Sequence, residues 1–495
     1  MSVGVALCAD LATHGLDVDE VSAALLAAGI PAAVVPGPCG RGAPIDGWDR
    51  VVFAVCPDGP TRDEVLSRAR RDDRDPGVGA ARVDAVEASS YGPDEGRSAR
   101  AAAVLDARAS GLGAPGPSPP DAFRMALPAG RMSRRSLLSS AVVRYPPVAV
   151  VGEVGCRGST ACGLCVETCP VDAIGMGGRV PLVEKEACIG CGACVRACPV
   201  EGAAQLPGAD LVRFEAELGR LATSADGAGL LVRCAGSPAV PEDALPGSWL
   251  PIEVPCLSIV SPAWALSALA AGVPTVAFRG CGSECGAKAS EQVEPAVAFV
   301  RQSLALLADA DDRVRLFLPP DDGRAPGADP GSIGPLGDGS PAIGLREPGA
   351  SETALLALGA TSGTVVGGGA PFGLVEFGAE GCTMCGLCAG VCPTAAIRFD
   401  KGPVAATLDI DRSECVGCGH CAAICPEGVL RVERGVDLGS LGRGAEPLKR
   451  SALARCRRCG EPVAPTAMLD RLRPLLDPAV LASTEGLCQR CRGLG

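Results

Sequence analysis

The sequence predicts a multidomain protein that combines α/β and α+β parts: two small α/β domains, two cysteine-rich modules and a four-cysteine tail. Three observations support this fold class. The chain has 495 residues, too many for one continuous core. Apolar strands alternate with helices in two separate segments. Finally, 27 cysteines recur at regular spacings while aromatic residues make up only 3% of the chain, so bound metal is expected to replace part of the hydrophobic core.

Sixteen of the cysteines form four quartets, and each quartet ends in Cys-Pro. Three have the spacing Cys-x2-Cys-x2-Cys-x3-Cys, whereas the first has five residues in its first gap. In chain order they are Cys156, Cys162, Cys165 and Cys169; Cys188, Cys191, Cys194 and Cys198; Cys382, Cys385, Cys388 and Cys392; and Cys415, Cys418, Cys421 and Cys425. In such a run three close thiolates hold one [4Fe-4S] cube and the fourth crosses to another cube. The sequence therefore predicts two modules, over 146–206 and 374–435, that hold four cubes.

The two modules resemble bacterial two-cluster ferredoxins. The resemblance implies four ligand sets: Cys156, Cys162 and Cys165 with Cys198; Cys188, Cys191 and Cys194 with Cys169; Cys382, Cys385 and Cys388 with Cys425; and Cys415, Cys418 and Cys421 with Cys392. In the first set Ser159 stands where the family has its first cysteine, so a three-iron cluster is the alternative to a complete cube there. His420 is expected to tune the polarity of its loop rather than to bind iron.

The N-terminal segment predicts an α/β domain over 1–105. VGVALC, PAAVVP and RVVFAVC have the composition of strands, the segment from Asp17 is helical, and 61–105 is expected to be helical and charged. A Gly/Pro-rich linker is predicted over 106–145. The segment resembles the N-terminal domain of the heterodisulfide reductase A protein, which implies a further cluster at Cys8, Cys39 and Cys56. Asp10 stands where that family often has a cysteine, so a fourth ligand would come from Asp10, His14 or elsewhere, and inert buried cysteines are the alternative.

Flavin and nicotinamide sites are not expected. The G-x-G-x-x-G formed by Gly111, Gly113 and Gly116 follows no predicted strand, and the prolines after it prevent a helix from starting there. The chain also lacks an adjacent Cys-Cys pair, which is the heterodisulfide-cleaving motif of the catalytic subunit.

A second α/β domain is predicted over 207–318, followed by a linker over 319–373. Its strands are GLLVRC, WLPIEVPC and VPTVAFRGC, and Ser261 with Pro262 opens a helix between the last two. Four cysteines lie at or just beyond strand ends, where α/β folds place ligands: Cys234, Cys256, Cys281 and Cys285. The segment resembles the delta subunit of methyl-viologen-reducing hydrogenase, which implies one [2Fe-2S] cluster and electron transfer between a hydrogenase and a heterodisulfide reductase. Purely structural cysteines are the alternative.

The tail, over 447–495, contains two Cys-x2-Cys knuckles separated by 28 residues: Cys456 and Cys459, then Cys488 and Cys491. Paired knuckles of this kind favour a structural zinc ion held by four thiolates in a zinc-ribbon-like fold. A fifth iron-sulfur cube is the alternative, because both groups use tetrahedral sulfur sites.

Charge and patterning indicate the environment. A net charge of -12 argues against nucleic acid and anionic membrane surfaces as partners. The regular metal spacings argue against a disulfide scaffold. Ser133–Leu138 resembles a twin-arginine export motif, but it lies deep inside the chain, and the uncharged stretch from Leu257 to Phe278 is interrupted by Pro262, Gly272 and Pro274. The sequence therefore predicts a cytoplasmic protein without a membrane span.

Together these features predict an electron-transfer subunit without catalytic residues of its own. Its expected partners are redox subunits: a hydrogenase, a formate dehydrogenase, a flavoprotein or a heterodisulfide-reductase-like complex. The sequence leaves two alternatives open. One is an iron-sulfur oxidoreductase that acts on a small substrate at an open cluster site, and the other is a redox sensor.

Overall fold

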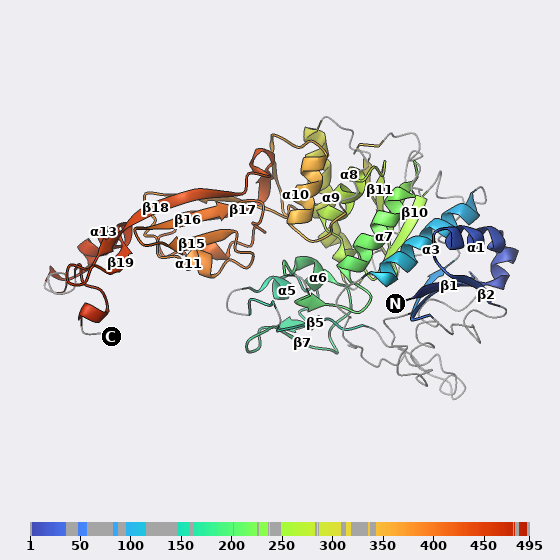
Figure 1. The fold of residues 1–495 in the computed structure, drawn as a ribbon, viewed down its shortest axis with the longest axis horizontal. Helices are drawn as coiled ribbons and strands as arrows, with labels where there is room; N and C mark the ends of the chain where they lie inside the picture. Colours follow the sequence, from blue (N-terminus) through green and yellow to red (C-terminus); the bar gives the residue numbers. More distant parts are fainter. Residues whose placement is uncertain are drawn as a thin grey trace. The chain divides into compact units, whose positions relative to one another are not determined.

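The computed structural model describes residues 2–35, 48–56, 83–87, 96–114, 147–153, 155–158, 162–200, 202–224, 227–235, 237, 249–282, 285, 287–307, 313–317, 335–336, 343–478, 480 and 485–492. The chain divides into two compact units (Figure 1). The first contains residues 1–156 and 164–360, and the second contains residues 157–163 and 361–495. Both predicted α/β domains and most of the first cysteine-rich module therefore share one unit.

The first unit begins with a parallel sheet in the strand order β2-β1-β3-β4. Its strands are β1 (Val3–Cys8), β2 (Ala32–Val35), β3 (Arg50–Val55) and β4 (Val83–Glu87). β1 and β3 are buried except at their first residues, as apolar strands in the middle of a parallel sheet should be. A 3-10 helix, η1 (Ala9–His14), follows β1, and α1 (Val18–Ala27) starts at Asp17, whose side chain accepts hydrogen bonds from the N–H groups of Asp19 and Glu20.

Two features of this domain differ from the sequence-based expectations. β4 is a strand inside the segment predicted to be helical, because its backbone pairs with β3 at the edge of the sheet; residues 57–82 lie outside the described part. Helix α3 (Arg97–Gly113) continues into the predicted linker. At Gly111 a Cβ atom would lie 2.9 Å from the carbonyl oxygen of Arg213, so this glycine lets α3 approach α7 closely. Glycine here permits close helix packing instead of ending the helix.

The second parallel sheet has the order β10-β9-β11-β12. Its strands are β9 (Gly229–Cys234), β10 (Trp249–Val254), β11 (Val276–Arg279) and β12 (Val314–Phe317). Both sheets have the same strand order. The strand that comes first in the sequence is an inner strand, the next one lies on one side of it, and the third and fourth lie on its other side. The helices with this sheet are α7 (Leu211–Thr223), η6 (Leu257–Ile259), α8 (Pro262–Ala270), α9 (Ala289–Leu306) and α10 (Gly349–Ala357).

Helix α10 lies inside the segment 319–373, which the sequence predicts to be a linker. It packs against α8, and its Ala354 and Leu355 are buried, so tertiary contacts hold a helix in a segment whose overall composition predicts a linker. Every residue of α8 is buried. Its Trp264 ring lies 5.3 Å from that of Phe214 in α7.

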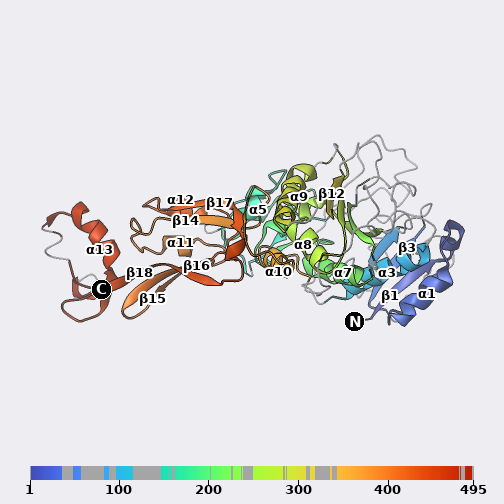
Figure 2. The same ribbon diagram turned by 90° about the horizontal axis from the view of Figure 1, so that it is seen from above.

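Helices α3 and α7 join the two sheets of the first unit (Figures 1 and 2). Between them Arg108 Nε lies 2.9 Å from Glu217 Oε1, and the two side chains are 3% and 0% exposed. A second pair, Arg220 Nη2 and Asp106 Oδ2, lies at 2.8 Å nearer the surface. A buried, charge-paired helix contact fixes the N-terminal domain against the second α/β domain.

The first cysteine-rich module contains short elements. They are β5 (Val150–Val151), α5 (Leu164–Glu167), β6 (Ile174–Gly175), β7 (Leu182–Val183), α6 (Ala193–Ala197) and β8 (Ala204–Gln205). β5 pairs with β8 and β6 with β7, both antiparallel. Two-residue strands give little stability on their own, so the loops around the cysteines form most of this module.

The second unit consists of antiparallel strands in the orders β13-β17-β14 and β15-β16-β18-β19. β18 pairs with β16 of the module and with β19 of the tail, so the tail continues the sheet of the second module. The strands are β13 (Thr364–Val366), β14 (Gly373–Phe377), β15 (Ile397–Lys401), β16 (Ala405–Asp411), β17 (Leu430–Asp437), β18 (Ala445–Arg455) and β19 (Pro462–Pro465). The helices are α11 (Leu387–Gly390), α12 (His420–Ile424), η9 (Leu438–Ser440), α13 (Thr466–Leu472), η10 (Arg473–Leu475) and η11 (Arg490–Arg492).

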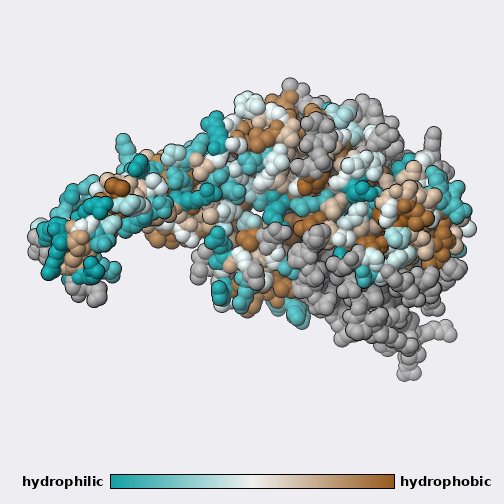
Figure 3. All heavy atoms as spheres, viewed as in Figure 1, coloured by the Kyte–Doolittle hydropathy of each residue, from teal (hydrophilic) through white to brown (hydrophobic). Residues whose placement is uncertain are grey.

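The mixed α/β architecture confirms the predicted fold class at that level; the zinc-ribbon form of the tail and the number of domains stay predictions. Among the described residues no helix is long and apolar enough to cross a bilayer. The uncharged stretch from Leu257 to Phe278 forms η6, α8 and β11, as the sequence indicates. On the face drawn in Figure 3, hydrophilic side chains predominate over the second unit.

Candidate iron-sulfur and metal centres

Three of the four quartets share one backbone feature. Gly192, Gly386 and Gly419 each stand two residues before the third cysteine and have φ angles of 80°, 78° and 76°. Each precedes a short helix that carries this cysteine. Such angles strain other residues, so glycine allows the sharp turn that brings the flanking cysteines around one cavity.

Cys169, Cys188, Cys191 and Cys194 line one largely apolar cavity in the first unit. Backbone N–H groups point at its sulfurs: Ala149 donates to Cys188 Sγ at 3.5 Å, and Ala173 donates to Cys169 Sγ at 3.2 Å. Burial raises the pKa of Cys191 to about 11 and also raises the pKa of Cys194. Without iron these two thiols keep their protons at neutral pH, so cluster binding would release protons.

Cys382, Cys385, Cys388 and Cys425 line a similar cavity in the second unit. Burial raises the pKa of Cys388 to about 11. Lys449 of β18 donates to the carbonyl oxygens of Ala379 and Cys382 at 2.6 and 2.7 Å. This ammonium group lies beside the cavity and opposes the rise in the pKa of Cys382 that burial causes.

The other set of the second unit gathers around Cys415. Burial raises the pKa of Cys415 to about 11 and that of Cys421 to about 12, and the neighbouring cysteines, Cys392 among them, add to both increases. Gly373 donates its N–H to the carbonyl oxygen of Cys415 at 3.0 Å. His420 donates its backbone N–H to the sulfur of Cys418, which lowers the pKa of that thiol against the larger effect of burial.

Three cysteines of the stretched quartet, Cys156, Cys165 and Cys198, belong to the first unit. Cys162, of the second unit, donates its backbone N–H to the carbonyl oxygen of Gly158 at 3.0 Å. Burial raises the pKa of Cys198; Cys156 adds to this increase, while the Arg346 guanidinium opposes it. Ser159 lies outside the described residues.

The four cysteines of the second α/β domain interact with one another at the carboxyl end of its sheet. Cys234 ends β9, Cys256 follows β10, and Cys281 with Cys285 follows β11. A hydrogen bond with Cys234 is the main cause that lowers the pKa of Cys256 to about 6, while burial raises the pKa of Cys281 to about 11. Cys256 Sγ and Ser258 Oγ lie 3.4 Å apart, and the hydrogen bond with Ser258 also lowers this pKa. One thiolate is therefore already available here at neutral pH.

Glu347 is a buried carboxylic acid beside helix α8 that sequence reasoning missed. Its Oε1 accepts hydrogen bonds from Ala263 N–H at 2.9 Å and from Ser351 Oγ at 2.8 Å. Burial raises its pKa to about 7, although these hydrogen bonds act in the opposite direction. Glu347 thus caps α8, a role that the sequence assigned to Ser261; Ser261 is the N-cap residue, but its side chain makes no capping hydrogen bond.

Two of the three N-terminal cysteines come together. The ligand atoms of Cys8, Asp10 and Cys56 all lie within 4.8 Å of one another. Cys8 and Cys56 are buried, whereas Asp10 is exposed. Cys39 lies outside the described residues. His14 stands at the end of η1, where its carbonyl oxygen accepts a hydrogen bond from Arg97 at 2.6 Å.

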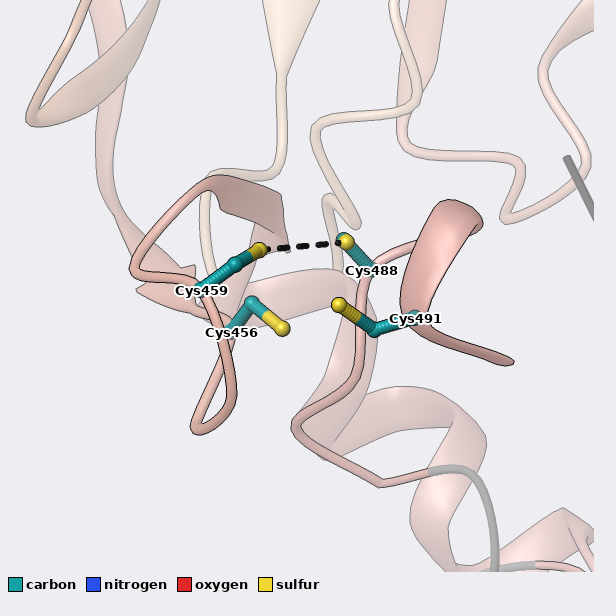
Figure 4. A group of neighbouring side chains, drawn as sticks. All are labelled: Cys456, Cys459, Cys488 and Cys491. Atoms are coloured by element: carbon teal, nitrogen blue, oxygen red, sulfur yellow. Dashed lines mark hydrogen bonds between the residues drawn. The ribbon is translucent and has the colours of Figure 1, made fainter. Parts of the chain in front are cut away.

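The four tail cysteines converge from two loops (Figure 4). Their sulfurs lie within 4.8 Å of one another, with Cys459 and Cys488 at 3.5 Å. Backbone N–H groups, first that of Cys488, lower the pKa of Cys456 to about 6. The Arg455 guanidinium donates to the carbonyl oxygens of Gly460 and Pro403, so it holds the loop in place.

The cysteine loops and the cavities that they line have the arrangement expected of iron-sulfur ligand sets. Residues 156–203 and 381–429 both match the 4Fe-4S dicluster domain, which confirms the resemblance of both modules to two-cluster ferredoxins.

The segment of the chain between these two matches a more particular family. Residues 234–323 match the delta subunit of methyl-viologen-reducing hydrogenase, which confirms the second resemblance. This matched segment begins at Cys234 and includes all four cysteines of the second sheet. A comparison with curated proteins gave no match. The likeness of the N-terminal domain to the heterodisulfide reductase A protein stays a prediction.

Proposed function

We propose that the chain is a multi-cluster electron-transfer subunit that relays electrons within a hydrogenase, formate dehydrogenase, flavoprotein or heterodisulfide-reductase-like complex of the cytoplasm. In this proposal the four ferredoxin-type sets bind [4Fe-4S] clusters, the set at Cys234 binds a [2Fe-2S] cluster, and the tail binds zinc. The chain contributes ligands, hydrogen bonds and burial that set potentials, and no residue is assigned a catalytic role.

The proposal rests mainly on how close two ligand sets lie to each other, the set that contains Cys191 and the set that contains Cys256. Besides burial, negative charge on Cys256 raises the pKa of Cys191, so these thiols of two sets influence each other directly. Between them a Cβ atom on Gly192 would lie 3.3 Å from the side chain of Ile259, which follows Cys256 by three residues. Electrons tunnel efficiently only over short distances. This contact therefore supports transfer between the first module and the second α/β domain.

Similar contacts link the two sets within each module. Charge on Cys165 adds to the increase in the pKa of Cys194 in the first unit. In the second unit charge on Cys388 adds to the increase in the pKa of Cys421. Both observations support a row of neighbouring centres rather than isolated ones.

The sulfur spacing in the tail supports zinc over a fifth cube. Four thiolates at about 2.3 Å from one tetrahedral ion stand roughly 3.8 Å apart. Ligand sulfurs that radiate from the corners of an iron-sulfur cube stand roughly 6 Å apart. The tail sulfurs, all within 4.8 Å of one another, fit the single ion better.

Anaerobic purification followed by metal analysis and EPR tests the proposal. We expect the iron and sulfide of four cubes and one [2Fe-2S] centre, together with zinc. Iron below the content of two cubes would refute the relay. Cys256→Ser should remove the [2Fe-2S] signal of the reduced protein and alter the line shape of a neighbouring cube. Cys459→Ser, which changes only the tail, should leave both signals intact.

A further inference from the structure

The N-terminal sheet places two cysteines in the same register as the second sheet. In the second sheet Arg233 pairs with Arg279, Cys234 follows the first of these residues by one position, and Cys281 follows the second by two. In the N-terminal sheet Leu7 pairs with Ala54, and Cys8 and Cys56 follow them by one and two positions. Cys234 and Cys281 also interact through a side-chain hydrogen bond. The shared strand order therefore brings a cysteine pair together at the carboxyl end of each sheet.

Among the residues that the structure describes, the third group beside each cysteine pair differs between the two sheets. In the second sheet further cysteines complete the set, whereas in the N-terminal sheet the third ligand atom belongs to the carboxylate of Asp10. Asp10 lies in the first turn of η1, directly after β1, and its carbonyl oxygen accepts a hydrogen bond from Thr13 Oγ1 at 2.7 Å. The turn that follows Cys8 thus carries the carboxylate back toward the two sulfurs.

The spacing of these atoms distinguishes a single ion from a cluster. Around one tetrahedral zinc ion, bonds of about 2.3 Å to sulfur and 2.1 Å to oxygen separate the ligand atoms by roughly 3.5 to 3.8 Å. The ligand sulfurs of a cube stand roughly 6 Å apart. The atoms of Cys8, Asp10 and Cys56 lie within 4.8 Å of one another, which suits one ion. Two thiolates and a carboxylate are donors that zinc and similar borderline divalent ions accept.

The geometry points to a mononuclear divalent-metal site formed by Cys8, Cys56 and Asp10, with zinc as the natural occupant, in place of the cluster that the family resemblance implies. A 2+ ion would offset the charge of two thiolates that are only 1% and 6% exposed. It would also hold the ends of the adjacent strands β1 and β3 together. Since Asp10 is exposed, the ion can be reached from solvent. This site does not depend on the proposed electron-transfer function.

Zinc analysis and cobalt substitution of the full-length chain, purified anaerobically, test the site. Asp10→Ala should lose one zinc ion per chain relative to the wild type, and Asp19→Ala, an exposed carboxylate of α1, should lose none. Asp10→Cys should keep the ion and increase the thiolate-to-cobalt charge-transfer absorption. Cys8→Ser should decrease that absorption.

Two results would overturn this inference. One is unchanged zinc in both Asp10→Ala and Cys8→Ser. The other is loss of about four iron atoms instead of one zinc from either variant, which would mean that a cube occupies the site. The iron content of the ferredoxin modules and the circular dichroism spectrum show whether each variant is folded. If Asp10→Ala fails to fold, the cobalt spectrum of Asp10→Cys decides.

Discussion

The buried side chain of Glu347 makes the stability of the protein depend on pH. Its pKa in the folded protein, about 7, lies above its ordinary value of 4.5. The folded state therefore holds this proton more tightly than the unfolded state does. Stability from this group is complete below pH 4.5 and is lost as the pH rises through 7.

Glu347→Gln should remove this loss. Between pH 6 and pH 8 we expect the variant to gain roughly 1 kcal/mol in free energy of unfolding relative to the wild type. Anaerobic denaturant unfolding at the two pH values measures the difference. Glu291→Gln, whose carboxylate is 69% exposed, serves as the control and should show no such gain. A pH-independent difference for Glu347→Gln would contradict the assignment.

Gly192 allows a second test at the scale of one residue. Gly192 and Gly208 both have φ near 80°, but a Cβ atom would contact Ile259 only at Gly192. Alanine at either position should cost about 1 kcal/mol of backbone strain. Gly192→Ala should in addition push α6 away from η6 and slow electron transfer between the two centres. Pulsed reduction followed by absorbance measures this rate; equal rates in the two variants would argue against the contact as a route.

At the scale of elements, the α3–α7 contact depends on a buried ion pair. Glu217→Leu leaves Arg108 without its carboxylate in a site that is 3% exposed. This should cost about 3 to 5 kcal/mol, whereas the double variant Arg108→Met with Glu217→Leu should recover most of the loss. Thermal unfolding of the wild type, Glu217→Leu, Arg108→Met and the double variant checks the pattern. Additive losses would show that the pair does not act as a unit.

The sequence was sufficient for elements whose signals are local. Cysteine spacing and the flanking glycines identify the ferredoxin loops, because a cubane needs several ligands from one tight turn. The strand ends at Cys8 and Cys234 follow from apolar runs that stop at a cysteine. By contrast, α10 and β4 form through packing and pairing with distant segments. The same reason hides Glu347 and Lys449, which reach their sites from 84 and 67 residues away along the chain.

On the scale of the whole molecule, the buried ligand sets should couple cluster loading to proton release. Burial raises the pKa of Cys191, Cys388 and Cys415 to about 11. Ordinary thiols are largely deprotonated at pH 9.5, but these three keep their protons. Proton release on anaerobic reconstitution, followed with an indicator dye, should therefore persist at pH 9.5. Its disappearance between pH 7 and pH 9.5 would mean that these loops are not buried before iron binds.

The completely buried helix α8 has a consequence for the energetics of electron transfer. It starts six residues after Cys256 and presents no exposed residue. Water near a redox centre reorients whenever the charge of that centre changes, and this reorientation contributes to the activation barrier. Cys256 itself is only 6% exposed, so few solvent dipoles lie next to its sulfur. The reorganisation energy at this centre should therefore be small, so an electron can cross with little driving force.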